Sequence, residues 1–136
     1  MIGAEVLRQA RALLGVPWRH LGRSETGLDC IGLVLLSASR SGLALPDPAP
    51  YPRRPTSHLM RREIEQHLVQ VNLSTAQEGD LLVFNAGRWG SHVGLASVHP
   101  LYSQPAVVHA YLPEKGVRED LRGTYRPVSA FRWQEP

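Results

Sequence analysis

The chain has 136 residues, of which 43% are hydrophobic and 20% are charged, and its formal net charge is +3. This length fits a single domain over residues 1–136, and the composition excludes the disordered and fibrous classes. The single cysteine excludes an internal disulfide and every zinc motif with two thiolates, and the longest apolar run is too short to cross a membrane.

The arginines are spread along the chain and form no basic stripe with interleaved aromatic residues. We therefore expect no nucleic-acid partner, although weak attraction to an anionic polymer such as cell wall stays open. The N-terminal residues lack the basic and apolar regions of a signal peptide. The sequence predicts cytoplasmic synthesis without a signal peptide, and no membrane partner.

The N-terminal segment predicts a helix over residues 3–14, followed by a loop. Gly15 ends this helix and Pro17 prevents its continuation. Residues 19–28 are polar and contain several glycines, which is typical of a loop. The apolar residues of the helix share one face: Val6, Leu7, Ala10, Leu13 and Leu14.

A second helix is expected to begin at Cys30, with Asp29 as its N-cap and Gly42 as its C-terminal stop. Residues 46–55 hold five prolines, which exclude regular hydrogen-bonded structure and predict an extended surface segment. Residues 57–70 predict a third, more exposed helix.

The C-terminal half changes pattern and becomes rich in short β-prone segments separated by loops. A chain with helices first and strands afterwards indicates an α+β fold with an antiparallel sheet. The expected strands cover residues 80–84, 92–98, 106–112 and 126–133.

Cys30 lies in the first turn of the expected second helix, where free backbone N–H groups and the helix dipole favour a thiolate. A lowered thiol pKa is what a nucleophilic cysteine requires, and Gly32 would keep this turn slim enough for a substrate to approach. The adjacent Asp29 opposes the thiolate unless its carboxylate is engaged elsewhere. The alternative is that Cys30 is a small buried apolar residue.

His92 and His109 lie on two neighbouring expected strands. A hairpin turn centred between Pro100 and Leu101 would pair residue i with residue 201−i, so that His92 faces His109 directly on one side of the sheet. A cysteine nucleophile needs an imidazole base, and that base needs an orienting partner. The three residues are therefore candidate catalytic groups, although a lone histidine on a strand is commonly structural.

The remaining histidines are expected to be structural or exposed: His20, His58, His67 and His99. The sequence has no close Cys/His pair with the spacing of a zinc finger. We therefore expect no metal and no cofactor.

Several motifs appear in the order that is typical of one enzyme family, and together they cover most of the chain. These motifs are Gly15-Val16-Pro17-Trp18, Gly27-Leu28-Asp29-Cys30-Ile31-Gly32-Leu33-Val34, Glu78-Gly79-Asp80-Leu81-Leu82-Val83-Phe84, Ser91-His92-Val93-Gly94-Leu95 and Val107-Val108-His109-Ala110. On these motifs the chain resembles the NlpC/P60 cysteine peptidases, especially the small cell wall peptidases of phage tails and gene-transfer agents.

The resemblance implies a papain-like core, with N-terminal helices packed on a five- or six-stranded antiparallel sheet. It implies hydrolysis of peptidoglycan stem peptides, commonly between D-glutamate and the diamino acid. In this family pattern Cys30 is the nucleophile, His92 the base and His109 the residue that orients the base. Asp29 matches a position that can receive a substrate amine, and Trp18 stands where many members have a tyrosine near the thiol.

The resemblance also implies phage-tail or tail-like assembly proteins as partners and incorporation into a phage tail or virion-like particle. Ile31 departs from the family pattern, because many members have serine there. Two alternatives follow from such departures and from the shared triad. One is a catalytically inactive tail-assembly or structural protein with the same fold, and the other is an amidase or acyltransferase.

Overall fold

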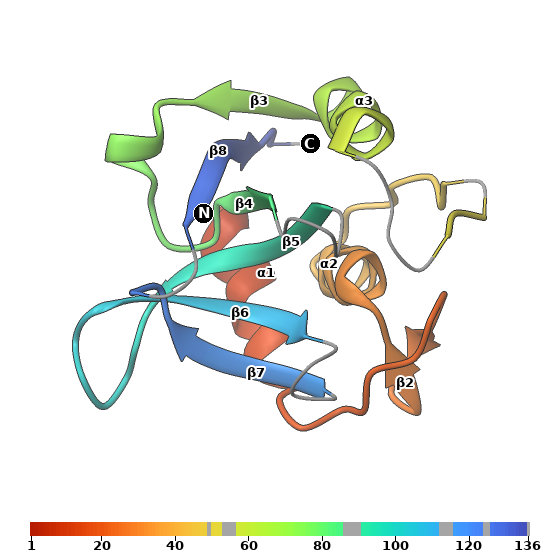
Figure 1. Ribbon diagram of the computed structural model, residues 1–136, viewed down its shortest axis with the longest axis horizontal. Helices are drawn as coiled ribbons and strands as arrows, with labels where there is room; N and C mark the ends of the chain where they lie inside the picture. The colour runs from red at the N-terminus through yellow and green to blue at the C-terminus, as the bar shows by residue number, and fades with distance from the viewer. Residues whose placement is uncertain (49, 53–56, 86–90, 112–115, 124–125, 136) are drawn as a thin grey trace.

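The computed structural model describes residues 1–48, 50–52, 57–85, 91–111, 116–123 and 126–135 (Figure 1). Helices precede most of the strands along the chain, as the sequence predicts. The helices are α1 (Ile2–Arg11), α2 (Cys30–Arg40), α3 (Ser57–His67) and the short 3-10 helix η1 (Leu73–Thr75). None of the described helices is both long and apolar enough to span a membrane.

The strands form a six-stranded sheet in the order β3-β8-β4-β5-β6-β7, in which every neighbouring pair is antiparallel. A separate pair, β1 and β2, precedes α2. This arrangement confirms the α+β fold with an antiparallel sheet. The strands are β1 (Arg23–Ser24), β2 (Gly27–Leu28), β3 (Leu68–Val71), β4 (Leu81–Asn85), β5 (Ser91–Val98), β6 (Pro105–Tyr111), β7 (Gly116–Leu121) and β8 (Pro127–Trp133).

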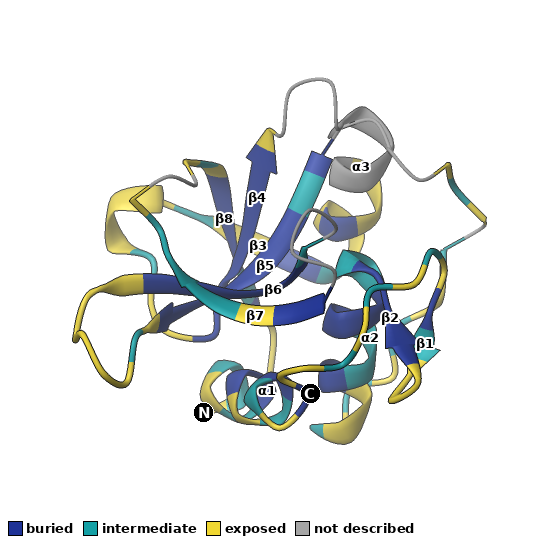
Figure 2. Ribbon diagram, turned by 60° about the horizontal axis from the view of Figure 1, so that its bottom comes forward, coloured by how far each residue is buried: buried dark blue, intermediate teal, exposed yellow. Residues whose placement is uncertain are grey.

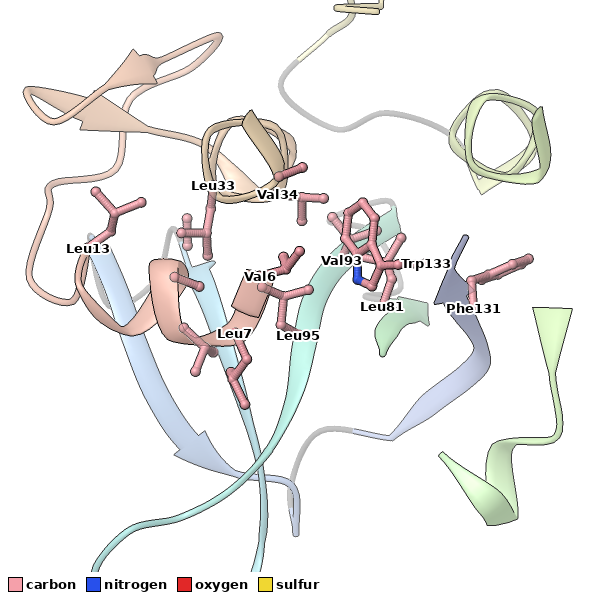
Figure 3. Packing of buried hydrophobic residues seen from close by; sticks show 14 of the residues in the cluster. Val6, Leu7, Leu13, Leu33, Val34, Leu81, Val93, Leu95, Phe131 and Trp133 are labelled. Atoms are coloured by element: carbon pink, nitrogen blue, oxygen red, sulfur yellow. The ribbon is translucent and has the colours of Figure 1, made fainter. Parts of the chain in front are cut away.

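Helices α1 and α2 cover one face of the sheet, with their buried sides turned toward the strands (Figure 2). Val6 of α1 and Leu33 of α2 point into the space between these helices and β5, where Leu95 lies (Figure 3). All three side chains are fully buried. This apolar layer fixes the start of α2 against the strands that carry His92 and His109.

The opposite face of the sheet carries a smaller apolar cluster: Leu82, Phe84, Ala96, Val107 and Ala130. Phe84 pairs directly with His92 across β4 and β5, and the two rings lie 5.8 Å apart. Because side chains alternate along a strand, His92 lies on this face while Val93 faces the helices. The prediction that His92 lies on the opposite face of the sheet from Val93 and Leu95 is confirmed.

Glycines end the first two helical segments as the sequence predicts. Gly15 has φ of +91° and Gly42 has φ of +87°, in the left-handed region that residues with a Cβ rarely adopt. Helix α1 itself ends at Arg11, earlier than predicted, and turns connect it to Gly15.

Three features of the fold differ from the sequence predictions. The expected third helix ends at His67, and the chain then enters β3, because Leu68 faces the core while the next residues form an exposed edge strand. Residues 19–28 contain the short strands β1 and β2 rather than loop alone. Strand β7 was not predicted. Residue 112, the end of one expected strand, residues 49 and 53–55 of the proline-rich segment, and the His58 side chain lie outside the described residues.

The Glu78-Gly79-Asp80 motif has a structural role. The Asp80 carboxylate accepts two hydrogen bonds from the Arg132 guanidinium, at 3.0 and 2.8 Å, and one from the backbone N–H of Gln77 at 2.7 Å. The indole of Trp133 donates to the carbonyl of Gly79 at 2.8 Å. These bonds fix the start of β4 to β8, so the motif supports the sheet at a distance from the histidines.

Candidate active site

The Asp29 carboxylate organises the start of α2. Its Oδ1 accepts hydrogen bonds from the backbone N–H of Gly32 at 2.7 Å and from Nη1 of Arg23 at 3.0 Å. Its Oδ2 accepts from the backbone N–H of Leu21 at 2.9 Å and from the Tyr51 hydroxyl at 2.6 Å. The predicted N-cap is confirmed, and three further donors from outside the helix bind the same side chain.

These four donors leave the Asp29 side chain only 4% exposed. A buried carboxylate is stabilised by such charged and neutral donors, and Arg23 supplies the opposite charge. Binding of a substrate amine by Asp29 stays a prediction, and it would require one of the present donors to move away.

Gly32 serves a different purpose from the predicted one. A Cβ at this position would collide with the carbonyl oxygen of Gly22. The slim first turn of α2 therefore admits the loop that precedes β1, and the expectation that it makes room for a substrate is wrong. The close approach fixes the segment containing Leu21, whose N–H reaches Asp29.

Cys30 follows Asp29 and is half-buried against the main apolar cluster. Burial and the negative charge of Asp29 raise the pKa of the thiol to about 12, and backbone hydrogen bonds, the largest from Val93, offset only part of this rise. The predicted lowering of the pKa by the helix N-terminus is therefore wrong for the free protein. The hydrogen bond from Val93 places the thiol against β5, next to the residue that follows His92.

His92 and His109 are joined by a hydrogen bond of 2.7 Å between His92 Nε2 and His109 Nδ1. Their ring centroids lie 4.9 Å apart. Burial, together with the neighbouring His109, lowers the pKa of His92 to about 3. His92 is therefore a neutral imidazole at neutral pH, as a general base must be before it accepts a proton.

The register that brings the two rings together differs from the predicted one. Leu95 pairs with Val108, so residue i of β5 lies opposite residue 203−i of β6, and His109 lies opposite Gly94 when the pairing is continued. The prediction that His92 directly faces His109 is wrong by two residues. The shift is even, so the two histidines still share a face and meet diagonally.

Gly94 makes this diagonal contact feasible. A Cβ at Gly94 would lie 2.5 Å from Cγ2 of Val107 and 3.0 Å from Cβ of His109. Such contacts are too short for ordinary packing, so a side chain here would displace one of these neighbours. The missing side chain lets His109 lie across β5 toward His92.

Asp120 is a member of the site that sequence analysis missed. Its Oδ2 lies 2.8 Å from Nε2 of His109, and its Oδ1 lies 3.4 Å from Nε of Arg118. The chain of contacts His92–His109–Asp120 therefore crosses the neighbouring strands β5, β6 and β7 (Figure 1). Residues 118–120 are three consecutive charged residues, so this stretch lacks the alternating or continuous apolar pattern that predicts a strand.

A row of rings lies beside the start of α2. Trp18 is half-buried, and its backbone bridges to Leu28, two residues before Cys30. The Trp18 ring stacks on His20 with centroids 6.3 Å apart, and His20 meets the Tyr51 ring edge-on at 5.9 Å. Tyr51 was not among the predicted site residues, and His20 was expected to be structural or exposed. The substrate-binding role of Trp18 stays a prediction.

A cavity of about 340 Å³ lies between α2, the proline-rich segment and α3, next to the residues that flank the thiol. Ile31 follows Cys30, and Val93 contacts its thiol; both line the cavity, whose walls are mainly aliphatic and proline side chains. Among the described residues, no group of three or more His, Cys, Asp and Glu side chains could hold a metal ion.

Solved structures share this fold at low sequence identity. The NlpC/p60 domain of the peptidoglycan hydrolase SagA is 22% identical with a TM-score of 0.68, and the match covers 95% of this chain and 97% of that one. NlpC2 from Trichomonas vaginalis is 18% identical with a TM-score of 0.71, covering 97% of this chain and 47% of that one. An NlpC/P60 family protein from Bacillus cereus is 22% identical with a TM-score of 0.67, and the match covers 98% of this chain and 40% of that one.

The chain thus spans nearly the whole SagA domain but less than half of the other two proteins. No curated protein matched the chain. The model of the NlpC/P60 family matches residues 15–133, which include α2 and the strands β3 to β8. The chain belongs to the NlpC/P60 family.

Proposed function

We propose that residues 1–136 form one catalytic domain, a cysteine peptidase that hydrolyses peptidoglycan stem peptides through Cys30, His92 and His109. The observation that carries the proposal is the 2.7 Å hydrogen bond between His92 and His109. The residue that follows His92 on β5, Val93, contacts the thiol of Cys30 through its backbone. Membership of the NlpC/P60 family and similarity to the domain of a peptidoglycan hydrolase support it.

In the proposed reaction, Cys30 attacks the scissile carbonyl carbon while its proton passes to the ring nitrogen of His92 that does not contact His109. The thiol pKa is raised and the His92 pKa is lowered, so the proton moves together with the attack rather than before it. The backbone N–H of Cys30, at the first turn of α2, is a donor for the developing oxyanion.

The protonated His92 then donates its proton to the departing amine, and a thioester remains on Cys30. A water molecule, deprotonated by His92, attacks the thioester and restores the thiol. His109 holds the His92 ring through both steps by its hydrogen bond.

The proposal extends to the bond and to the setting of the reaction. The substrate bond is the one between D-glutamate and the diamino acid, with Trp18 beside the bound peptide, and the enzyme acts from a phage tail or tail-like particle. The motifs around Cys30, His92 and His109 support this part through their resemblance to small phage-tail peptidases.

The test is release of peptides from purified peptidoglycan by the wild type and by Cys30→Ala. We expect the variant to release no peptide above background, because no other cysteine can form the thioester. Equal urea unfolding midpoints for the two proteins would show that the fold is retained. Undiminished release by the variant would refute the proposal.

A further inference from the structure

We propose that Asp120 is a positioning residue that fixes the proton on each of the two histidines, so that the reactive nitrogen of His92 is left unprotonated. The role of His92 as the base rests on the proposed function, whereas the proton positions themselves can be measured without any activity. Asp120 lies on β7, two strands away from the strand that carries His92.

The hydrogen bonds determine the proton positions one after another. An ionised carboxylate only accepts hydrogen bonds, so the 2.8 Å contact with Asp120 requires a proton on Nε2 of His109. Nδ1 of a neutral His109 is then an acceptor, and the 2.7 Å contact requires a proton on Nε2 of His92. A neutral His92 consequently has its lone pair on Nδ1.

Burial makes this assignment strong. The His109 side chain is 0% exposed, so water does not compete for its ring nitrogens, and the Asp120 side chain is 19% exposed. The hydrogen bond from His109 is the main cause that lowers the pKa of Asp120, and this keeps the carboxylate ionised at neutral pH.

The contacts of Tyr111 with His109 and of Arg118 with Asp120 leave this donor order unchanged. The Tyr111 ring stacks on His109 with centroids 5.0 Å apart, a contact between ring faces rather than between hydrogen-bonding atoms. Arg118 interacts with Oδ1 of Asp120 at 3.4 Å, whereas His109 binds Oδ2. Each carboxylate oxygen therefore has a separate donor.

The arrangement also serves the charged stage of the reaction. When His92 accepts the thiol proton, its positive charge lies at one end of a chain of hydrogen bonds that ends on a negative carboxylate. His109 keeps its proton on Nε2 throughout, so no proton passes from His109 to Asp120. A neutral group in place of Asp120 removes this stabilisation and permits the opposite tautomer of His109.

Nitrogen-15 NMR of the histidine rings tests the assignment in the intact chain at pH 7. We expect both His92 and His109 to carry the proton on Nε2 in the wild type. In Asp120→Asn the amide can donate to His109, so we expect a mixture of tautomers or the Nδ1-protonated form. Glu119→Gln is the matched control, because Glu119 lies on the same strand but binds Arg11 of α1 at 2.9 Å.

Kinetics provide the second readout. We expect kcat for peptide release to fall about 10- to 100-fold in Asp120→Asn with KM unchanged, because Asp120 acts on the base and not on the substrate. Asp120→Glu retains a carboxylate and is expected to recover part of this loss. The control Glu119→Gln should keep both the tautomers and kcat of the wild type.

The proposal is overturned if wild-type His109 carries its proton on Nδ1, or if Asp120→Asn retains the wild-type tautomers and kcat. The wild-type spectrum decides the first point even if the variant does not fold. Activity that survives in Cys30→Ala would overturn the proposed function instead, and it would leave the tautomer result unaffected.

Discussion

The start of α2 and the strands β5 to β7 each place an aspartate beside a proposed catalytic residue, but the two aspartates have different partners. Asp29 precedes Cys30 and accepts hydrogen bonds from four donors that come from α2, strand β1, the loop before β1 and the proline-rich segment. Asp120 accepts from His109 at 2.8 Å and from Arg118 at the longer distance of 3.4 Å.

The comparison shows that the donors around a carboxylate decide what it does for its neighbour. The hydrogen bonds of Asp29 fix the backbone at the start of α2, while its charge adds through space to the rise in the thiol pKa that burial causes. Asp120 bonds directly to the imidazole chain, so its charge favours the protonated base. Proximity to a reactive group is therefore not enough to assign a carboxylate to catalysis.

The largest effect is expected at Gly94, which allows the diagonal contact in the strand region. The Cβ of Gly94→Ala would lie 2.5 Å from Val107 and 3.0 Å from His109, so the His109 ring must shift. We expect a loss of about 2 kcal/mol in the free energy of unfolding and a fall in activity of about 100-fold. Urea unfolding and peptide release measure the two effects.

Gly3→Ala is the control for this substitution. A Cβ at Gly3 has its nearest neighbours at 3.7 Å, an ordinary contact, and Gly3 lies within α1. The control should be unchanged or stabilised by up to about 1 kcal/mol. Full activity in Gly94→Ala would show that the diagonal contact is not needed.

An intermediate effect is expected at Arg23, which supplies the positive charge to Asp29. Arg23→Gln removes a charged hydrogen bond from a carboxylate that is 4% exposed, so we expect a loss of about 1.5 kcal/mol in the free energy of unfolding. The uncompensated charge should raise the thiol pKa further and slow alkylation of Cys30 by iodoacetamide at pH 8.

Arg40→Gln is the matched control, because Arg40 pairs with Glu25 at 2.8 Å on the surface, where the glutamate side chain is 67% exposed. The control should cost less than about 0.5 kcal/mol. Equal unfolding energies for the two variants would contradict the central structural role of Asp29.

The smallest effect concerns the pH dependence of stability. The pKa of His92 is about 3 in the folded chain and about 6.5 in an unfolded one, so the unfolded chain binds more protons between these values. The free energy of unfolding must therefore fall as the pH drops below about 6.5. Because His92 is half-buried, we expect His92 to account for about 1 kcal/mol of this loss between pH 7 and pH 5.

Urea unfolding of the wild type and of His92→Gln at pH 7 and pH 5 measures this contribution. The variant should lose less stability than the wild type over this range. His99→Gln, at the tip of the hairpin between β5 and β6, should lose as much as the wild type. An identical pH dependence in all three proteins would show that His92 is not held neutral by the fold.

The sequence predicted the strongest elements because their signals are local. The N-cap at Asp29, the helix start at Cys30 and the alternation around His92 each follow from neighbouring residues. The hairpin register was wrong by two residues, because turn chemistry near Pro100 does not determine which residues pair. The prediction that the two histidines share a face is still correct, because a register shift of two residues leaves every side chain on the same face of the sheet.

The remaining parts of the site depend on long-range contacts. The sequence between His109 and Asp120 holds Pro113 and Gly116, residues typical of turns, but the segment after them contains consecutive charged residues that are typical of surface loops. Tyr51 reaches Asp29 from a segment without regular structure. The thiol pKa depends on burial, which a motif does not reveal, so the helix position alone predicted the wrong direction.

The hydrogen bond from Tyr51 to Asp29 links the position of the proline-rich segment to the geometry around Cys30. Any event that pulls this segment away removes one of four donors from a carboxylate that determines the geometry of the first turn of α2. By reciprocity, a molecule that tightens the first turn must also hold the segment in place more firmly. A partner protein that binds the chain at Tyr51 would therefore change the surroundings of the thiol without contacting Cys30.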